Sequence, residues 1–269
     1  MNAEPSIHLM QIVYNDETMV SADRHFPILD NTANLRPDWF EYWPIRNYFK
    51  DNEIDDYTFY GFFSPKFTEK TSYSLEEISD YIKQHHEFHD VFIFSPMPDQ
   101  GCFFINVFEQ QEIYDNGFQE TMNHFVKFCF FGMTIDQMVM SSKETIYSNY
   151  FVARGIFWKE WLRITNLLFE LSESHQFPDY NKKTDYEGVE RKVFMQERVA
   201  SLILAHEPKF RSLSYKTFLK PWSASKLQNF IHEAVVCDSL KMSYNSTKDP
   251  AYINQFYEIR DKVIKKLTS

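Results

Sequence analysis

The chain has 269 residues, of which 43% are hydrophobic and 18% aromatic, and its formal net charge is −10. This length and composition predict a folded protein with a sizeable core and exclude a disordered or low-complexity chain. The excess of acidic residues argues against a nucleic-acid-binding protein, because such proteins present a basic surface to the phosphate backbone.

The amino terminus, MNAEPSIHLMQIVY, lacks the basic segment followed by an apolar segment that defines a signal peptide. The sequence has no apolar run near the ~20 residues that a membrane span requires. Cys102, Cys129 and Cys237 show no CxxC spacing, and we expect them to be reduced. We therefore expect a cytoplasmic protein, and peripheral association with the inner face of the cytoplasmic membrane is compatible with this interpretation.

Short apolar runs in the first half of the chain alternate with a helical pattern. We predict strands at Ile7–Tyr14, Tyr57–Ser64, Val91–Ser95 and Phe103–Phe108. Between the second and third runs, Ser74 and Glu77 form the capping box that starts a helix. This alternation predicts an α/β fold with a mixed, mainly parallel sheet flanked by helices.

The second half is predicted to be mainly helical. Apolar residues recur at helical spacing at Phe118–Cys129, 157–173, 190–206, 223–240 and 250–267. Asp249 is the predicted N-cap of the last helix, with Pro250 at its first position. We expect one domain over residues 1–269, with an α/β portion at 1–155 and a mainly helical portion at 156–269.

The motifs of several common enzyme classes are absent. The sequence has no GxxxxGK[ST], GxGxxG, GxSxG or HExxH, which removes the main support for P-loop, dinucleotide-binding, hydrolase and zinc-protease functions. His85, His86 and His89 lie close together, but no second His or Cys cluster at ligand spacing accompanies them. A solvated helix end explains them better than a metal site, and we predict no metal ligands.

Polar residues follow three of the predicted strands directly. Tyr14, Asn15 and Asp16 end the first run, Ser64 ends the second, and Ser95 ends the third. In an open α/β sheet, ligands bind at the carboxyl ends of the strands. Any one of these ends is more often a plain loop. If the strands are parallel neighbours, however, the three converge on one crevice, which favours a site.

Residues 29–46, LDNTANLRPDWFEYWPIR, form the densest polar and aromatic stretch of the sequence. Glu41 could pair with Arg36 or Arg46 and simply fix this segment. Alternatively, arginine forks suit phosphates, and tryptophan or tyrosine faces suit sugars and bases. Both interpretations stay open, and Asn31, Arg36 and Arg46 are therefore candidate ligand-binding residues.

Residues 59–71, FYGFFSPKFTEKT, run from an aromatic strand into a polar turn. Gly61 indicates a bulge or a close approach of the backbone. Exposed lysines usually face solvent, so Lys66 and Lys70 have a simple structural explanation. Their position after a strand end makes them alternative candidates for binding an anionic group.

Polar residues also lie within two later apolar segments. Asn106 in FINVFEQQE requires a specific partner, because a buried unpaired amide is costly. Glu109 is either a general base or a helix-capping acid. Asn149, in YSNYFVARGIFW, repeats the pattern of Asn106.

Taken in order, QIVYNDET, LDNTANLRPDWFEYWPIRNYF, FYGFFSPKFTEKT, VFIFSP, NVFEQQE and SNYFVARGIFW resemble a family of bacterial glycosyltransferase-like proteins. The resemblance covers roughly residues 7–165. Proteins of this family occur in capsule and lipopolysaccharide assembly, and their expected fold is GT-A-like.

The resemblance implies a nucleotide-sugar donor, with a UDP-sugar expected first, bound across the strand ends. It places Tyr14, Asn15 and Arg36 near the nucleotide, and Ser64, Lys66 and Lys70 near the phosphates or the sugar. The acceptor would be a glycan or a lipid-linked glycan. The predicted substrate-binding set is completed by Gln11, Asn31, Arg46, Gly61, Ser95, Asn106 and Asn149.

One feature of GT-A enzymes is missing from the sequence. No Asp-x-Asp occurs, whereas most such enzymes use this motif to hold a divalent metal on the pyrophosphate. A leaving diphosphate still requires neutralisation of its charge. We therefore predict metal-independent transfer with no cofactor, in which Arg36, Arg46, Lys66 and Lys70 supply positive charge, although the sequence does not exclude Mg²⁺ or Mn²⁺.

An inverting transfer also requires a carboxylate that deprotonates the acceptor hydroxyl. Glu109 is the first candidate for this base, followed by Asp16 and Glu41. The leading hypothesis is thus a glycosyltransferase that extends a surface polysaccharide. The alternatives are a carbohydrate- or nucleotide-binding protein without catalysis, and a structural partner in a polysaccharide-assembly system.

Overall fold

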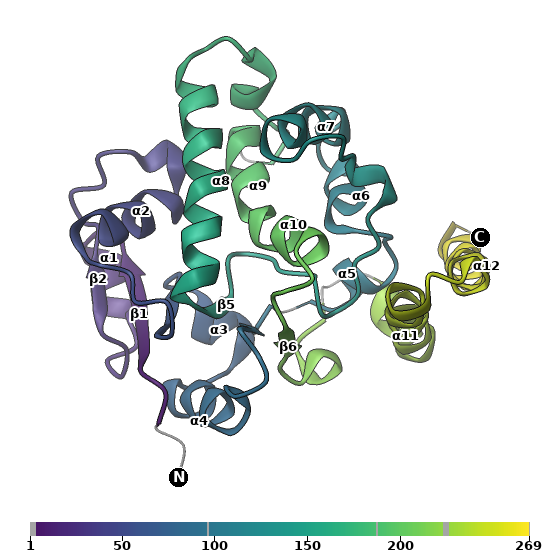
Figure 1. Cartoon of the computed structure of the whole chain (residues 1–269), viewed down its shortest axis with the longest axis horizontal. Coiled ribbons are helices and arrows are strands. Elements are labelled where there is room, and N and C mark those ends of the chain that lie inside the picture. The colour runs from purple at the N-terminus through teal and green to yellow at the C-terminus, as the bar shows by residue number, and fades with distance from the viewer. Residues whose placement is uncertain (1–3, 96, 187, 223–225, 269) are drawn as a thin grey trace.

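The computed structural model describes residues 4–95, 97–186, 188–222 and 226–268 (Figure 1). Two of the predicted features therefore lie partly outside the described residues. These are Pro96, which follows the third predicted strand, and the first three positions of the helix predicted at 223–240.

Within the described residues, the strands form one six-stranded sheet in the order β2-β1-β3-β5-β4-β6. Their bounds are β1 Ile7–Val13, β2 Ile28–Asp30, β3 Phe59–Phe63, β4 Val91–Ile93, β5 Phe151–Arg154 and β6 Ser212–Ser214. Strand β5 is antiparallel to both of its neighbours, and the other pairings are parallel. Five strands therefore run in one direction, which confirms the predicted α/β fold with a mixed, mainly parallel sheet.

The helices of the first part of the chain are α1 Asp16–Ser21, α2 Tyr42–Asp51, α3 Phe67–Thr71, α4 Leu75–His85, α5 Asp99–Cys102, α6 Val107–Glu112 and α7 Phe118–Cys129. Those of the second part are α8 Gly155–Glu173, α9 Arg191–Glu197, α10 Val199–His206, α11 Ile231–Thr247 and α12 Pro250–Thr268. Short 3₁₀ turns lie at Pro37–Trp39, Ile135–Gln137, Pro178–Asn181, Thr217–Leu219 and Lys226–Phe230.

The predicted helix starts at Ser74 and Asp249 are confirmed. Ser74 and Glu77 form both bonds of the capping box at the start of α4. Asp249 Oδ1 accepts a hydrogen bond of 2.9 Å from the backbone nitrogen of Ala251, and α12 begins at Pro250. Each cap satisfies a backbone donor that the first turn of a helix leaves without a partner.

The strand predicted at Phe103–Phe108 is wrong. Residues 103–106 are the irregular link between α5 and α6, with Asn106 as the N-cap of α6, and Val107 and Phe108 are the first residues of that helix. The apolar residues of the segment are buried against helices, which an apolar run of this length permits as readily as burial in a sheet. The predicted helical portion, 156–269, also contributes a strand to the sheet, namely β6.

Side chains of the central strands alternate between two hydrophobic clusters, one on each face of the sheet. Tyr60 and Phe62 of β3 belong to a cluster with residues of α2 and α8, whereas Phe59 and Phe63 belong to one with residues of α3 and α4. This alternation follows from the two-residue repeat of a strand. A sheet buried on both faces reads as a continuous apolar run, as FYGFF does.

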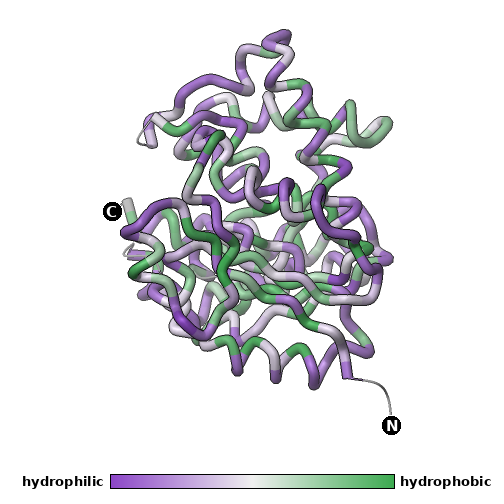
Figure 2. Tube along the Cα trace, turned by 90° about the vertical axis from the view of Figure 1, so that its left-hand side faces the viewer, coloured by the Kyte–Doolittle hydropathy of each residue, from purple (hydrophilic) through white to green (hydrophobic). Residues whose placement is uncertain are grey.

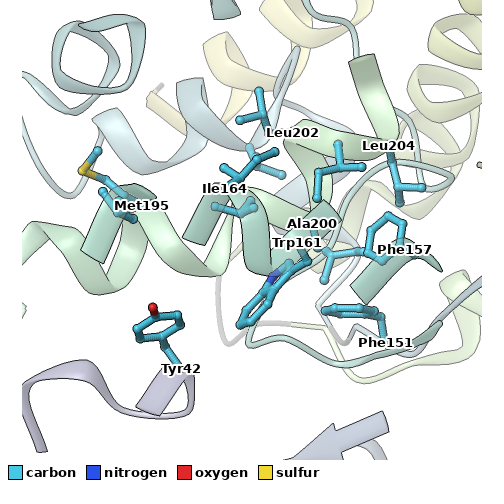
Figure 3. Close-up of a cluster of buried hydrophobic side chains, with 14 of the residues drawn as sticks. Tyr42, Phe151, Phe157, Trp161, Ile164, Met195, Ala200, Leu202 and Leu204 are labelled. Carbon is cyan, nitrogen blue, oxygen red and sulfur yellow. The ribbon is translucent and has the colours of Figure 1, made fainter. Parts of the chain in front are cut away.

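Helices α8, α9 and α10 form the centre of the larger cluster (Figure 3). Ile164 of α8 lies beside Leu202 of α10, Trp161 of α8 belongs to the same cluster, and all three are fully buried. Trp158 of α8 also donates a hydrogen bond of 2.9 Å to the carbonyl oxygen of Tyr60, which fixes this helix against β3. Figure 2 shows hydrophobic and hydrophilic residues alternating along the outer helices, as expected for helices with one buried face.

Helices α11 and α12 form an antiparallel pair at one end of the molecule (Figure 1). The pair packs on α5 through a small cluster that includes Cys102, Cys237 and Phe256. The buried Lys241 of α11 donates hydrogen bonds of 2.8 Å to the carbonyl oxygens of Gly101 and Phe104. These bonds satisfy carbonyls at the end of α5 and anchor the helix pair.

Candidate functional site

The carboxyl ends of five strands meet at one edge of the sheet, because β1, β2, β3, β4 and β6 run in the same direction. Tyr14, Ser64 and Ser95 therefore come from strands that end at this edge, as the sequence predicts. Strand β5 lies between β3 and β4 and runs the opposite way, so its amino end adds Tyr150 to the same edge. Ligands of open α/β sheets bind at such an edge.

Helix α3 follows β3 directly and carries Lys70 to this edge. Lys70 Nζ lies 5.8 Å from the centroid of the Tyr150 ring. The Tyr150 hydroxyl is 2.6 Å from Ser64 Oγ, and its ring packs edge-on against Phe67 at 4.9 Å. Tyr150 is thereby fixed in place, and Lys70 is held beside it.

Two glutamates from distant parts of the chain share the environment of Lys70. Burial, and then the negative charge of Glu197, raise the pKa of Glu41 from 4.5 to about 7. Burial also raises the pKa of Glu197, while Arg198 and Lys70 act in the opposite direction. Glu197 keeps 21% of its side chain exposed, so it is enclosed by protein yet reachable from solvent.

Two interacting carboxyl groups in such a place titrate together, because a negative charge on one disfavours the charge on the other. Glu41, with its pKa raised to about 7, can accept or release a proton near neutral pH. A general base is most effective when its pKa is near the working pH. We call Tyr14, Glu41, Ser64, Lys70, Tyr150 and Glu197 the strand-end cluster.

Tyr14 has a buried hydroxyl for which no hydrogen-bond partner is found within the described residues. Burial, followed by the charges of Glu41 and Tyr150, raises the pKa of Tyr14 well above 10. The phenol is therefore neutral and retains its proton. A buried polar atom without a partner is uncommon in folded proteins, and a bound ligand is one way to satisfy it.

A cavity of about 330 Å³ adjoins the strand-end cluster, and Lys70, Glu197 and Arg198 are part of its wall. Arg198 is buried and donates hydrogen bonds to the backbone carbonyls of Val107 and Phe194 and to the side chains of Gln110 and Gln111. Its role is therefore to organise the wall of the cavity.

The remaining polar residues near the end of β1 have structural roles. The buried Gln11 donates to the carbonyl oxygens of Ser64 and Pro65 and accepts from the backbone nitrogen of Asp23. Asn15 is the N-cap of α1, where Asp16 is exposed in the first turn. Asn31 donates to the side chain of Asn34 at 3.3 Å. These contacts shape the edge of the sheet without requiring a ligand.

Arg36 and Arg46 form a different cluster, between α2 and α8. Both guanidinium groups lie over Trp43 and Phe169, at 5.0–5.7 Å from the ring centroids. Arg36 makes a two-pronged ion pair with Asp38, and a third bond of 2.7 Å joins it to Glu173. Arg46 Nε donates to Asn166 Oδ1 at 3.1 Å. These arginines are paired with groups other than Glu41.

Lys66 is exposed and precedes α3, so of the two lysines in residues 59–71 only Lys70 joins the strand-end cluster. Gly61 lies in the buried centre of β3, away from the strand end. A Cβ added there would come within 2.8 Å of Val152 Cγ2 and 2.9 Å of Leu9 Cδ2. The glycine therefore permits close packing of neighbouring strands and forms no bulge, since the β1–β3 register is continuous.

Ser95 and Asn149 hold loops together at the strand-end edge. Ser95 Oγ accepts from the backbone nitrogen of Tyr147 at 2.9 Å and donates to its carbonyl oxygen at 3.2 Å. The buried Asn149 pairs with Gln196 through two amide contacts of 3.4 Å. Ser148 and Asn149 both have positive φ angles, of 55° and 53°, so the loop before β5 is locally strained.

Asn106 and Glu109 stabilise the start of α6. Asn106 accepts from the backbone nitrogens of Phe108 and Glu109 and donates to two carbonyl oxygens, so the predicted specific partners are confirmed. Glu109 accepts a bond of 2.7 Å from the backbone nitrogen of Ile105 and one of 2.8 Å from Arg260 of α12. Both of its oxygens are thus engaged, which favours the capping role over the role of a base.

Sequence reasoning missed Glu197 and Arg198, and it noticed Tyr150 only as the neighbour of Asn149. Glu197 lies in the helical segment MQERVA, where an acid is normally a solvated residue. A feature that could have indicated it is the two adjacent charges between the mostly buried run VFMQ and the fully buried run VASLIL. Charged residues within such a run require partners.

No family model matches the chain, and no curated protein or solved structure matches it either. No helix in the described part of the chain is long and apolar enough to cross a lipid bilayer. The described residues also contain no group of three or more His, Cys, Asp or Glu side chains that could hold a metal ion.

Proposed function

We propose that the chain is a glycosyltransferase, which transfers a sugar from a nucleotide-sugar donor to a growing bacterial surface polysaccharide of the capsule or O-antigen type. The observation that carries this proposal is the strand-end cluster, in which Glu41 and Glu197 adjoin Lys70 at the edge where five strands end. The predicted GT-A-like fold is compatible with a mixed, mainly parallel sheet flanked by helices.

The donor is proposed to bind across the strand ends, with its diphosphate beside Lys70. The ammonium group of Lys70 is the positive charge of the strand-end cluster, and it would stabilise the charge that develops on the leaving diphosphate. The Tyr14 hydroxyl retains its proton and would donate to an oxygen of the donor, which gives this buried group the partner that it lacks. A UDP-sugar is the expected donor.

The base of an inverting transfer is proposed to be the Glu41–Glu197 pair. The ionised carboxylate takes the proton of an acceptor hydroxyl, and the acceptor oxygen forms a bond to the anomeric carbon. The bond between that carbon and the diphosphate oxygen breaks, and the nucleoside diphosphate leaves with the electron pair. The pair replaces Glu109 in this role, because both oxygens of Glu109 are engaged by Ile105 and Arg260.

The first test uses a panel of UDP-, GDP-, CMP- and dTDP-sugars. Binding is measured by thermal shift, and turnover is measured by release of the nucleoside diphosphate, or of CMP from the CMP-sugars. Lys70→Ala should weaken the affinity for the best donor, whereas Lys50→Ala, at an exposed position of α2, should leave it unchanged. Glu41→Gln and Glu197→Gln should slow turnover and retain donor binding. If no nucleotide sugar binds to the folded protein, the proposal is wrong.

Transfer is proposed to be metal-independent, because Lys70 supplies charge at the position where the leaving diphosphate would lie. Turnover should then persist in EDTA and should not rise when Mg²⁺ or Mn²⁺ is added. Loss of turnover in EDTA, with recovery on adding either ion, would contradict this part of the proposal and leave the remainder standing.

The alternative is a carbohydrate- or nucleotide-binding protein without catalysis. The observation that favours it is the contact of 3.5 Å between Glu197 and Arg198, since pairing with a guanidinium group lowers the basicity of a carboxylate. Donor binding without release of the nucleoside diphosphate, in the presence of a range of glycan acceptors, would support this alternative.

A further inference from the structure

A second compartment lies next to the strand-end cluster and shares Lys70 and Glu197 with it. It is the cavity of about 330 Å³ bounded by α3, α6, α9 and the loops around Met97 and Ser148. Its volume falls at the lower end of the ~300–1,000 Å³ range of small-molecule sites. It therefore suits one or two small rings and is too small for an extended chain.

The wall of this cavity combines amides, phenols and one further aromatic ring. Gln110 and Gln111 come from α6, Tyr114 follows that helix, Tyr186 comes from a loop, and Phe194 and Glu197 come from α9. Hydroxyl groups such as those of Tyr114 and Tyr186 form hydrogen bonds with hydroxyl-rich ligands, and aromatic faces cover the apolar C–H surfaces of sugar rings. The amide of Gln110 is held by Arg198 and Gln100 and shapes the wall instead. Tyr186 packs edge-on against Phe194 at 6.1 Å, which gives the cavity an aromatic side.

The charges of the wall argue against an anionic ligand. Arg198 already donates to four protein oxygen atoms, on Val107, Phe194, Gln110 and Gln111. Lys70 is thus the remaining positive charge among the residues of the wall, and the proposed function already assigns it to the diphosphate of the donor. A second anionic group would meet the carboxylate of Glu197 without a further free cation, whereas a neutral polyhydroxyl ligand requires none.

The position of Glu197 links this cavity to the proposed reaction. Glu197 is part of the cavity wall and interacts electrostatically with Glu41, and Glu41 in turn interacts with Tyr14. A donor beside Tyr14 and a sugar in the cavity would therefore both lie near the Glu41–Glu197 pair. A hydroxyl of that sugar would then lie near the base.

The geometry points to this cavity as the site for a terminal sugar ring of the acceptor, bound as an uncharged saccharide. The assignment of this sugar as the acceptor rests on the proposed function. The binding of a sugar is inferred from the chemistry of the wall alone. The rim residues Tyr114 and Tyr186 are 52% and 61% exposed, so each can be replaced with little effect on the core.

The test is titration of the protein with methyl glycosides of glucose, galactose, N-acetylglucosamine and rhamnose, observed by saturation-transfer NMR. UDP is titrated separately. Tyr186→Ala and Tyr114→Ala should each weaken binding of the best glycoside about tenfold, through loss of an aromatic contact, and leave UDP affinity unchanged. Tyr57→Ala removes a tyrosine before β3 that is more exposed than either rim tyrosine, and it should change neither affinity. Thermal melting verifies that each variant is folded.

The outcomes separate this inference from the proposed function. If UDP binds but no glycoside does, or if both rim variants bind glycosides as the wild type does, the cavity is not a sugar site and the proposed function stands. If glycosides bind and both rim variants weaken them, but no nucleotide or nucleotide sugar binds, the cavity is a sugar site and the glycosyltransferase proposal falls.

Discussion

Replacing Glu41 with glutamine is expected to stabilise the fold at neutral and alkaline pH and to have little effect in acid. Burial and the charge of Glu197 raise the pKa of Glu41 from 4.5 to about 7. The folded protein therefore holds the Glu41 proton more tightly than the unfolded chain does. As a result, the free energy of unfolding decreases as the pH rises from about 4.5 to about 7.

The size of this effect follows from the pKa. A rise from 4.5 to about 7 corresponds to about 3 kcal/mol, because each pKa unit is worth about 1.36 kcal/mol. Glutamine keeps nearly the same shape and cannot ionise. The variant should thus match the wild type below pH 4.5 and exceed it by about 2–3 kcal/mol above pH 7, with partial solvent contact favouring the lower value.

The measurement is urea denaturation of both proteins between pH 4.5 and pH 8, followed by far-ultraviolet circular dichroism. Glu17→Gln, an exposed position of α1, is the control for the chemical change alone. In a Glu197→Gln background the effect of Glu41→Gln should shrink, because the charge of Glu197 is one cause of the raised pKa. A stability difference that is the same at every pH would refute the reasoning.

Three further substitutions test the fold around the cluster. Gly61→Ala should lower stability by about 1–3 kcal/mol in a thermal melt, because the added methyl group would press on Val152, and it should leave donor affinity unchanged. A melting temperature equal to that of the wild type would show that β3 has room for a methyl group. Arg191→Met should lower the free energy of unfolding by about 3–5 kcal/mol in urea denaturation, because it leaves the buried Asp115 without its ion-pair partner at 2.6 Å. Adding Asp115→Leu to the same chain should recover part of this loss. Lys220→Met should stabilise the protein by more than about 1 kcal/mol at pH 6, because burial lowers the pKa of Lys220 to about 7 and protonation in the folded state is unfavourable. That gain should fade as the pH rises from about 7 toward 10.5, because the lysine of the unfolded chain then loses its proton as well, and an equal gain at pH 6 and pH 10 would point to packing as the cause.

The parts of the fold that the sequence predicts are those with strong local signals. Strands β1, β3 and β4 are long or fully apolar, and the start of α4 carries both residues of a capping box. Strands β2 and β6 have only three residues each, and β6 reads Ser-Leu-Ser. Such segments become strands because a neighbour supplies the hydrogen bonds, and this information is not local.

The segment Phe103–Phe108 shows how one polar residue changes an interpretation. Its apolar residues satisfied the pattern of a buried strand, yet Asn106 satisfies two backbone donors of α6 and ends any extended pairing there. The polar residue within the apolar run was the helix start signal. Length and apolar content alone do not separate a short strand from a buried link between helices.

In the candidate site, too, some residues are predicted by local patterns and others are brought together only by the fold. Tyr14, Ser64 and Lys70 were predicted because they follow strands, and ligands of open α/β sheets bind at the carboxyl ends of the strands. Glu41 was a reserve candidate, and the structure adds Glu197, which lies 156 positions further along the chain. Only the packing of α9 against the segment before α2 brings the two carboxylates together, and no local pattern encodes that contact.

Strand β5 has a consequence for how the chain is made. It joins β3 to β4, so the sheet remains in separate pieces until residues 151–154 have left the ribosome. About 90 residues lie between β3 and β5 in the sequence. At a synthesis rate of about 5–20 residues per second, β5 therefore appears roughly 4–18 seconds after β3. During that interval β3 has an open, phenylalanine-rich edge that can pair with other chains. A nascent protein of this topology is therefore a natural client for chaperones that cover exposed strands.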